Sequence, residues 1–351
     1  MSRPSFNIGR HHIGADQPCY IIAELSANHR QSYEESERLV QAAYEAGADA
    51  VKIQTFTPET MTLDFREGDF MAKSAAWRGK SLFDLYQEAY MPWDWQPRLK
   101  EFADGIGIEL FSSPFDSTAV DFLQEMNVAA YKIASFEFND LALIRKCAAT
   151  GKPIIMSTGM ASLAEIEEAL AAAREAGARD IALLRCTSAY PAPAAHMNLR
   201  TIPHMADTFD VVSGLSDHTL GTTVSVASVA LGAKVVEKHF TLSREVETLD
   251  GSFSLEPHEF KFMVDAIRET ESSLGQVHYG PSDADRYNVS SRRSLYASAD
   301  IPANGVITAG NVRSVRPGYG LAPKYLAQLL GRKALVAIPR GTPISWKQFM
   351  P

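Results

Sequence analysis

The sequence predicts an α/β protein in which a (β/α)8 barrel is followed by a small, mostly β domain. A strand followed by a helix recurs eight times within roughly 250 residues, which is the repeat and the size of a (β/α)8 barrel. After Gly275 the pattern changes to a polar, turn-rich stretch and then to short β-type runs. The 351 residues also exceed one ordinary hydrophobic core. We therefore place the barrel at residues 1–274, a linker at 275–293 and the small domain at 294–351.

Each predicted barrel strand is a short run of apolar and β-branched residues, as expected for parallel strands that are buried on both faces. The eight runs lie at residues 20–25, 50–54, 108–112, 130–133, 153–156, 181–184, 211–214 and 234–237. Between them, apolar residues at helical spacing end at glycines such as Gly47 and Gly151. Helices are predicted at 33–46, after Pro114, at 141–149 and at 256–274.

Two parts of the chain depart from this alternation. Residues 55–90 contain a TPET turn, a Gly-Asp turn and several aromatics, so we expect a long loop over the carboxyl ends of the strands, where loops commonly carry function. In the small domain, the runs SLYAS, GVITAGNVRSV and RKALVAI alternate with Gly and Pro turns, and a short helix is predicted near residues 324–330. So small a module buries little apolar surface, and we expect it to dock onto another part of the protein.

The composition argues against several kinds of partner. The chain has 34 basic and 42 acidic residues interspersed along it, and its net charge of −8 argues against nucleic acid or an anionic membrane. The three scattered cysteines, Cys19, Cys147 and Cys186, are typical of free thiols in a reducing compartment. Neither a signal-peptide segment nor a run of about 18 apolar residues occurs. We expect a cytoplasmic protein.

Polar residues gather at the carboxyl ends of the predicted strands, where (β/α)8 enzymes hold their chemistry. They are Glu24, Lys52, Gln54, Ser112, Ser113, Lys132, Ser135, Glu137, Ser157, Thr158, Ser188, Ser216, Asp217, His218 and His239. Lys52 and Lys132 lie within apolar strands, where a lysine is costly to bury without an anion. For either lysine alone, a structural ion pair with Glu24 or Glu137 is an equally good interpretation. Two lysines, several hydroxyls and the helix-opening turn STG on one rim favour a phosphate site.

Two histidines end consecutive strands of the barrel. His218 follows VVSGLSD and His239 ends AKVVEKH, one strand-helix unit later. Because neighbouring parallel strands bring their carboxyl ends into one crevice, the two imidazoles are expected to lie together. A lone histidine at such a place usually forms a hydrogen bond at the strand end. Two at matching places favour a divalent metal with open positions for water or substrate.

A series of motifs carries a resemblance to one enzyme family. In chain order they are AELSANH, GADAVKIQT, FSSPFD, YKIASFE, STGM, TSAYPAP, GLSDHTLG and EKHFTL. From about residue 20 to its C-terminus the chain resembles the sialic acid synthase family, and the segment from Ser294, with VRPGYG, resembles the antifreeze-like (SAF) domain of these enzymes. The resemblance implies a barrel enzyme that condenses phosphoenolpyruvate with an acetamido sugar, giving a nine-carbon 2-keto-3-deoxy acid and phosphate.

The resemblance also implies roles for individual residues. Those that would bind phosphoenolpyruvate are Lys52, Ser113, Lys132, Ser135, Ser157 and Ser216. The catalytic residues would be Glu24, Lys132, His218 and His239, and the two histidines would hold a divalent metal, Mn²⁺ before Mg²⁺ or Co²⁺. The sugar would be faced by Gln54, Glu137, Tyr190, Asp250 and Arg316, with Arg316 supplied by the other subunit of a domain-swapped homodimer. Ser188 departs from the neuraminate-type pattern, which has Asn at this position.

Two other functions remain open from the residues. A Schiff-base aldolase on the same barrel would use Lys52 or Lys132 as a covalent nucleophile, would need no metal, and would be trapped by borohydride with a carbonyl substrate. A carbohydrate-binding protein without catalysis would use the small domain. The number of polar groups on one rim argues against the second alternative.

Overall fold

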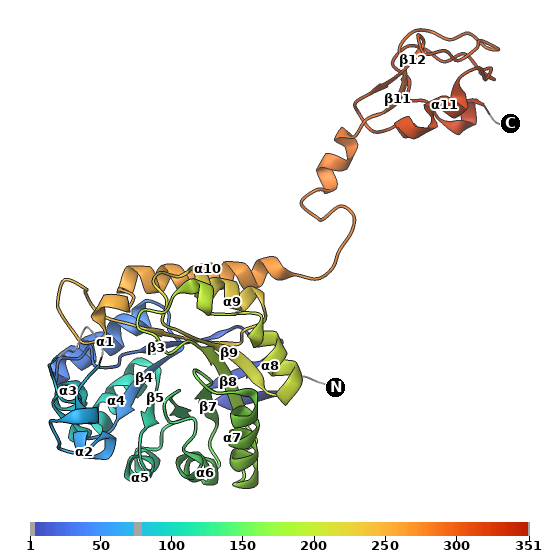
Figure 1. Cartoon of the computed structure of the whole chain (residues 1–351). Coiled ribbons are helices and arrows are strands. Elements are labelled where there is room, and N and C mark those ends of the chain that lie inside the picture. The colour runs from blue at the N-terminus through green and yellow to red at the C-terminus, as the bar shows by residue number, and fades with distance from the viewer. Residues whose placement is uncertain (1–3, 74–78, 350–351) are drawn as a thin grey trace. The chain divides into compact units, whose positions relative to one another are not determined.

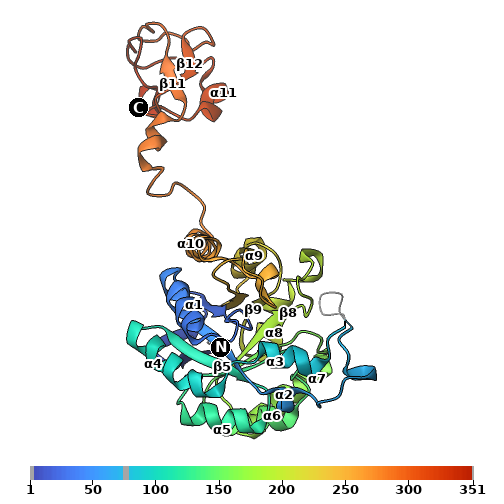
Figure 2. The ribbon, with the colours of Figure 1, turned by 90° about the vertical axis from the view of Figure 1, so that its left-hand side faces the viewer.

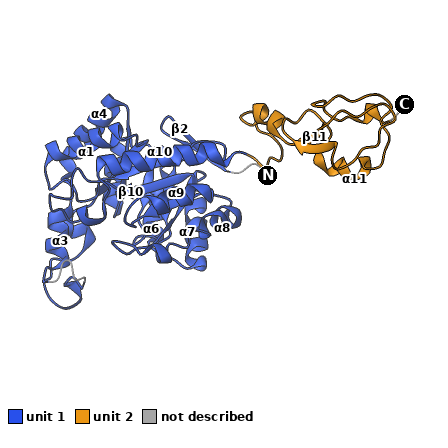
Figure 3. Ribbon diagram, turned by 90° about the horizontal axis from the view of Figure 1, so that it is seen from above, with its two compact units in different colours: residues 1–275 blue, residues 276–351 orange. Residues whose placement is uncertain are grey.

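The computed structural model describes residues 4–73 and 79–349. The chain forms two compact units, Met1–Gly275 and Gln276–Pro351, which Figure 3 shows in different colours. Each unit has its own hydrophobic core.

The first unit is a closed barrel of eight parallel strands, which confirms the predicted fold. Around the barrel the strand order is β10-β3-β4-β5-β6-β7-β8-β9, so the chain runs once around and closes between its first and last barrel strands. The strands are β3 (Tyr20–Glu24), β4 (Ala50–Thr55), β5 (Glu109–Pro114), β6 (Tyr131–Ile133), β7 (Ile154–Ser157), β8 (Ile181–Cys186), β9 (Val212–Asp217) and β10 (Val235–His239). Their apolar sequences follow from burial on both faces, inside the barrel and beneath the helices.

The helices lie around the outside of the barrel (Figures 1 and 2). They are α1 (Tyr33–Glu45), α4 (Gln96–Ile106), α5 (Ser117–Glu125), α6 (Leu141–Ala149), α7 (Leu163–Glu175), α8 (Thr201–Phe209), α9 (Thr223–Ala230) and α10 (Pro257–Leu274). Several begin at a side-chain cap, because the first backbone N–H groups of a helix lack partners within it. The Ser32 hydroxyl accepts a hydrogen bond from the N–H of Glu35, and Ser162 forms a capping box with Glu165. Within the described ranges, none of the helices combines the length and the apolar character needed to cross a bilayer.

An N-terminal hairpin precedes the barrel and was not predicted. Its strands β1 (Ser5–Ile8) and β2 (His11–Gly14) are antiparallel and joined at Gly9, whose φ of +54° is the left-handed conformation that favours glycine. Phe6, Ile8 and Ile13 are buried in the same apolar cluster as the barrel interior. The hairpin therefore belongs to the folded core of the first unit.

The predicted loop at residues 55–90 is partly helical. It contains α2 (Pro58–Met61) and α3 (Leu82–Ala89), and α3 begins at Ser81, whose hydroxyl accepts a hydrogen bond from the N–H of Asp84. The prediction of an irregular segment is therefore wrong for residues 82–89. Here the N-terminal cap and the amphipathic pattern of a helix outweigh the turn residues on either side. Residues 74–78 of this segment lie outside the described residues.

The second unit is built around a short antiparallel pair, β11 (Ser294–Ala297) and β12 (Val312–Val315). The run RKALVAI forms no strand; it contributes single bridges, from Lys333 to Val306 and from Ile338 to Ile301. The predicted helix is the single turn α11 (Leu326–Leu329), and a 3₁₀ helix, Arg286–Ser291, lies within the predicted linker. A small apolar cluster holds the unit together.

Candidate active site

A pocket of about 320 Å³ opens at the carboxyl ends of the barrel strands. Most of the predicted rim and sugar-facing residues line it, namely Glu24, Lys52, Gln54, Lys132, Ser135, Ser157, Ser188, Tyr190, Ser216, His218, His239 and Asp250. They converge because side chains alternate along a strand. On β4, for example, Lys52 and Gln54 face the pocket while Val51 and Ile53 pack under the helices.

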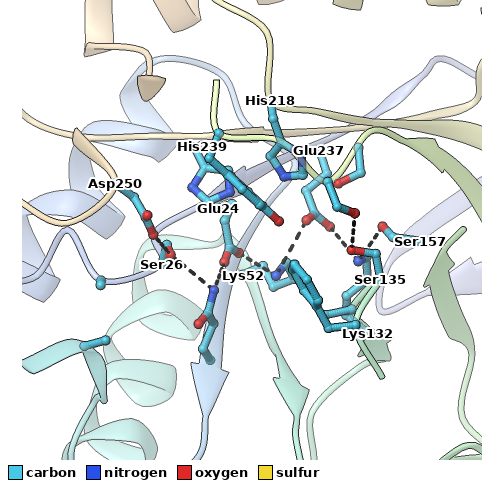
Figure 4. Close-up of a pocket in the computed structure, with 18 of the residues that line it drawn as sticks. Glu24, Ser26, Lys52, Lys132, Ser135, Ser157, His218, Glu237, His239 and Asp250 are labelled. Carbon is cyan, nitrogen blue, oxygen red and sulfur yellow. Dashed lines mark hydrogen bonds and ion pairs between the residues drawn. The ribbon is translucent and has the colours of Figure 1, made fainter. Parts of the chain in front are cut away.

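The centre of the pocket is a buried cluster of two lysines and two carboxylates (Figure 4). Lys52 Nζ lies 2.7 Å from Glu24 Oε2 and 3.6 Å from Glu237 Oε1. Lys132 Nζ lies 3.7 Å from Glu237 Oε2 and donates a hydrogen bond of 2.7 Å to the hydroxyl of Ser157. All four charged side chains are at most 5% exposed. Glu237 thus bridges the two lysines.

The sequence did not single out Glu237 as a functional residue. It precedes His239 by two positions in VVEKH, so strand alternation places both on the pocket face. Glu137, the predicted partner of a lysine, does not take this place. Its Oε2 atom is buried and, among the described residues, has no hydrogen-bond partner, and burial raises the pKa of Glu137 to about 7.

Burial and charge act in opposite directions on the cluster. Burial raises the pKa of Glu24, against the effect of Lys52. Burial also opposes ionisation of Glu237, but Lys132 and Lys52 outweigh it and lower the pKa of Glu237. Burial lowers the pKa of Lys132, whereas Glu237 and Glu24 outweigh the same effect at Lys52 and raise its pKa. The two lysines and the two carboxylates balance in charge. A further positive charge near the cluster would therefore strengthen the binding of an anionic ligand.

His218 and His239 lie side by side above this cluster, with ring centroids 5.2 Å apart. His218 Nδ1 donates a hydrogen bond of 3.0 Å to the carbonyl oxygen of Thr187, so Nε2 of the neutral ring carries the lone pair. His239 Nδ1 is buried and has no hydrogen-bond partner in the part of the chain that the structure describes. Burial lowers the pKa of both histidines and keeps them neutral, the form that binds metal ions.

These two imidazoles fit a divalent metal with open positions. An unpartnered buried nitrogen and a neighbouring ring with a fixed tautomer are suited to ligation. Residues 4–73 and 79–349 contain no cluster of three or more His, Cys, Asp or Glu side chains that would hold a metal. Further ligands would therefore come from water or substrate.

A hydrogen-bonded chain runs from Glu24 along one side of the pocket. Gln54 Nε2 donates to Glu24 Oε1 at 2.7 Å and to Ser26 Oγ at 3.2 Å, and Ser26 in turn donates to Asp250. Burial raises the pKa of Asp250. Ser26 was not predicted as a site residue, although it lies within the motif AELSANH; it has a left-handed φ of +46°, in the turn after β3.

Part of the pocket lining is apolar. Phe56, Phe115 and the α3 residues Leu85, Tyr86 and Ala89 line it. The ring of Phe56 makes edge contacts with the rings of Phe115, at 5.3 Å, and Tyr86, at 5.8 Å. We call these five residues the apolar wall. A ligand in the pocket therefore meets both charged groups and hydrocarbon.

Three predicted site residues lie elsewhere than in the pocket lining. Ser113 is fully buried and accepts a hydrogen bond of 3.1 Å from Lys52 Nζ. Glu137 is absent from the lining residues among those described. Arg316 belongs to the second unit, in the turn after β12. Of the remaining rim residues, Ser112 and Thr158 bond backbone carbonyl groups, and Asp217 pairs with Lys238.

Ser188 lies at the edge of the charged cluster. Its hydroxyl is 2.8 Å from that of Ser135, and both pack on the turn at Gly159. A Cβ atom at Gly159 would lie 2.4 Å from Ser135 Cβ and 2.5 Å from Ser188 Oγ, so a side chain there displaces both serines. The close approach of the STG turn thus requires glycine.

This closed (β/α)8 barrel has buried lysines, hydroxyls and paired imidazoles at the carboxyl ends of its strands. Such a site is typical of enzymes that act on small anionic substrates. Comparison with known proteins gives the family. Residues 39–279 match the NeuB family and residues 292–350 match the SAF domain. The chain belongs to the NeuB family, whose members are generally metal-dependent, and it is a phosphoenolpyruvate-dependent nonulosonic acid synthase.

Individual relatives match along nearly the whole chain. A pseudaminic acid synthase of Campylobacter jejuni is 44% identical over 96% of this chain and 98% of its own length. A pseudaminic acid synthase of Helicobacter pylori is 40% identical over 94% and 97%. Among solved structures, the spore coat polysaccharide biosynthesis protein SpsE of Bacillus subtilis superposes with a TM-score of 0.68, at 33% identity and 99% coverage of both chains.

Proposed function

We propose that this enzyme is a pseudaminic acid synthase, which joins phosphoenolpyruvate and water to 2,4-diacetamido-2,4,6-trideoxy-L-altrose and releases phosphate. The observation that carries the proposal is the meeting, in one pocket, of the lysine and serine cluster, the imidazole pair and the apolar wall. The similarity to two pseudaminic acid synthases supports this choice of sugar. The alternative is the same chemistry on another acetamido sugar, as in an N-acetylneuraminate or legionaminic acid synthase.

The lysine cluster suits phosphoenolpyruvate, which carries a carboxylate and a phosphate. Lys52 and Lys132 would neutralise these groups, and the hydroxyls of Ser135, Ser157 and Ser216 would donate hydrogen bonds to their oxygens. Ser113 would act indirectly, by holding the Lys52 ammonium group in place. Glu237 lies between the two lysines and favours their charged forms before the substrate binds.

His218 and His239 would hold the divalent metal, with Mn²⁺ preferred over Mg²⁺ or Co²⁺. A metal held there would supply Lewis acidity to the aldehyde oxygen of the open-chain sugar. The protein's own contribution is to keep both imidazoles neutral and oriented, through burial and through the bond of His218 to Thr187.

Glu24 is the best placed carboxylate for the proton transfer that accompanies addition of water at C2. It is buried, it lies 2.7 Å from Lys52, and Gln54 fixes its other oxygen. A carboxylate with its pKa raised by burial is a better base than one in water, because its charged form is less stabilised. Water attacks C2 and gives one proton to the base, which passes it to the alkoxide formed from the sugar aldehyde. The C2 hydroxyl then loses its remaining proton to phosphate as the keto group forms and the C–O bond to phosphate breaks.

The apolar wall makes the enzyme selective for a 6-deoxy sugar. The 6-methyl and acetamido methyl groups of the diacetamido sugar would match Leu85, Ala89 and the ring of Tyr86, whereas the 6-hydroxyl of N-acetylmannosamine would leave water for a largely apolar surface. We expect kcat/KM for 2,4-diacetamido-2,4,6-trideoxy-L-altrose to exceed that for N-acetylmannosamine by roughly 100-fold or more. Phosphate release from phosphoenolpyruvate with a panel of acetamido sugars measures this preference.

A variant pair localises this selectivity. Leu85→Ala removes part of the apolar wall and is expected to raise KM for the deoxy sugar more than for N-acetylmannosamine. Gln87→Ala, an exposed change on the same helix, is the matched control and is expected to leave both constants unchanged. Equal or better rates with N-acetylmannosamine in the unmodified enzyme would contradict the choice of sugar and favour the neuraminate alternative.

We also propose that the active enzyme is a domain-swapped homodimer in which Arg316 reaches the sugar from the other subunit. The two units have opposite charge: residues 1–275 contain 24 basic and 39 acidic residues, and residues 276–351 contain ten basic and three acidic ones. Opposite charge favours docking of the small unit onto a barrel. Arg316 lies in a Gly/Pro turn, RPGYG, which presents a guanidinium group rigidly.

A further inference from the structure

We infer that a buried ion pair on the outer face of the barrel, between Asp217 and Lys238, is a positioning pair that fixes the two imidazoles relative to each other. The inference rests on the proposed metal-binding role of His218 and His239. Neither member of the pair faces the pocket. Both side chains are 0% exposed, and Lys238 Nζ lies 3.0 Å from Asp217 Oδ2.

The pair lies directly beside the histidines in the barrel. Lys238 and Asp217 are paired in the register of the parallel strands β10 and β9. Because side chains alternate along a strand, the residues that follow them, His239 and His218, turn to the pocket. The ion pair is therefore a link between the two backbone segments that carry the imidazoles.

Asp217 also fixes the backbone turn that contains His218. One carboxylate oxygen, Oδ1, accepts hydrogen bonds from the backbone N–H of Thr219, at 2.9 Å, and from the Thr219 hydroxyl, at 2.8 Å. This is an Asx turn, with His218 as its middle residue. Lys238 closes the ring by donating to the carbonyl oxygen of Thr219 as well as to Asp217. The turn, and with it the height of His218 above β9, is thus tied to β10.

Helix α9 completes the network. The other oxygen, Asp217 Oδ2, accepts a hydrogen bond of 2.6 Å from the hydroxyl of Ser225 on α9. The carboxylate therefore has four donors from three segments: the turn, the helix and the neighbouring strand. A carboxylate satisfied this completely has one arrangement, which makes it suited to fixing geometry.

Stability alone does not account for the pair. Taking two charges out of water costs free energy, and a well-packed apolar pair at the same place is often as stable or more stable. The charges do not serve ligand binding either, since they face away from the pocket. What an apolar pair lacks is the directed hydrogen bonds that hold the turn around His218. Groups that fix the orientation of metal ligands typically tune metal affinity.

The test compares metal binding with stability in the full-length protein. In Asp217→Leu/Lys238→Met, the dissociation constant of Mn²⁺, measured from the electron paramagnetic resonance signal of free Mn²⁺, is expected to rise at least about ten-fold. The thermal unfolding temperature is expected to stay at or above that of the unmodified protein. The control, Asp49→Leu/Arg268→Met, removes an ion pair of 3.1 Å next to the amino end of β4 and is expected to leave Mn²⁺ binding unchanged.

A milder pair of variants tests the inference without disturbing the fold. Ser225→Ala removes one donor from Asp217, and Ser228→Ala, one turn further along α9, removes a hydroxyl that donates to the carbonyl oxygen of Ser225. We expect a two- to three-fold rise in the Mn²⁺ dissociation constant, about 0.5 kcal/mol, for the first and none for the second. If Mn²⁺ affinity is unchanged in both Ser225→Ala and Asp217→Leu/Lys238→Met, the positioning role is wrong while the proposed metal site still stands. An unmodified protein that binds no Mn²⁺ overturns the proposed metal site and this inference with it.

Discussion

Replacement of His218 or His239 by alanine is expected to abolish turnover. Each imidazole would supply one of only two protein ligands to the metal, so the loss should exceed the roughly 100-fold that removal of an outer partner costs. Mn²⁺ binding should be lost in parallel with activity. The fold should persist, because both rings lie at the rim of the barrel and not in its packed interior.

The control for this prediction is His204→Ala, which removes an exposed imidazole on α8. It should leave both Mn²⁺ binding and turnover at the level of the unmodified enzyme. Circular dichroism and thermal unfolding establish that the rim variants are folded. If the double variant His218→Ala/His239→Ala still turned over substrate in excess EDTA, the metal assignment would be wrong.

A mixture of two inactive proteins is expected to regain activity if Arg316 acts across subunits. One partner carries His218→Ala in the barrel, and the other carries Arg316→Ala in the small domain. After subunit exchange, half of the dimers are mixed, and one site in each combines an intact barrel with an intact arginine. About a quarter of the activity of the unmodified enzyme should therefore return.

The same experiment separates the two arrangements of the small domain. If Arg316 served its own barrel, every site in the mixture would carry one defect and no activity would appear. A mixture of His218→Ala with His239→Ala is the matched control, since both changes lie in the barrel and no exchange restores a site. Exchange itself can be followed by mass spectrometry of the intact dimers.

Much of this architecture could be predicted because it follows from local rules. Apolar runs with a lysine or histidine near their ends predict both the strands and the site at the rim, because the carboxyl ends of parallel strands lie on the same side of the barrel. Lys52, Lys132, His218 and His239 are found in the pocket for that reason. The pairing of Lys52 with Glu24 likewise follows from adjacent strands, β3 and β4, in which the two residues are in register.

The role of Glu237 depends on closure of the barrel and could not be inferred from the residues around it in the sequence. Its strand, β10, pairs with β3, more than 200 residues earlier in the chain, and only this closure brings it opposite Lys52 and Lys132. Glu137 is nearer to Lys132 in sequence and therefore seemed the simpler partner. The helix α3 was missed for a different reason, because aromatics and turn residues around it obscure an eight-residue pattern.

The most direct test of the proposed synthase reaction is the fate of the bridging oxygen of phosphoenolpyruvate. The enzyme is incubated with Mn²⁺, the 2,4-diacetamido-2,4,6-trideoxy-L-altro sugar and phosphoenolpyruvate labelled with ¹⁸O in the C–O–P bridge, and both products are weighed by mass spectrometry. The account predicts a nine-carbon acid without label and phosphate that carries all of it, because water adds at C2 and the C–O bond breaks. Label retained in the organic product, or no nine-carbon acid, would contradict it.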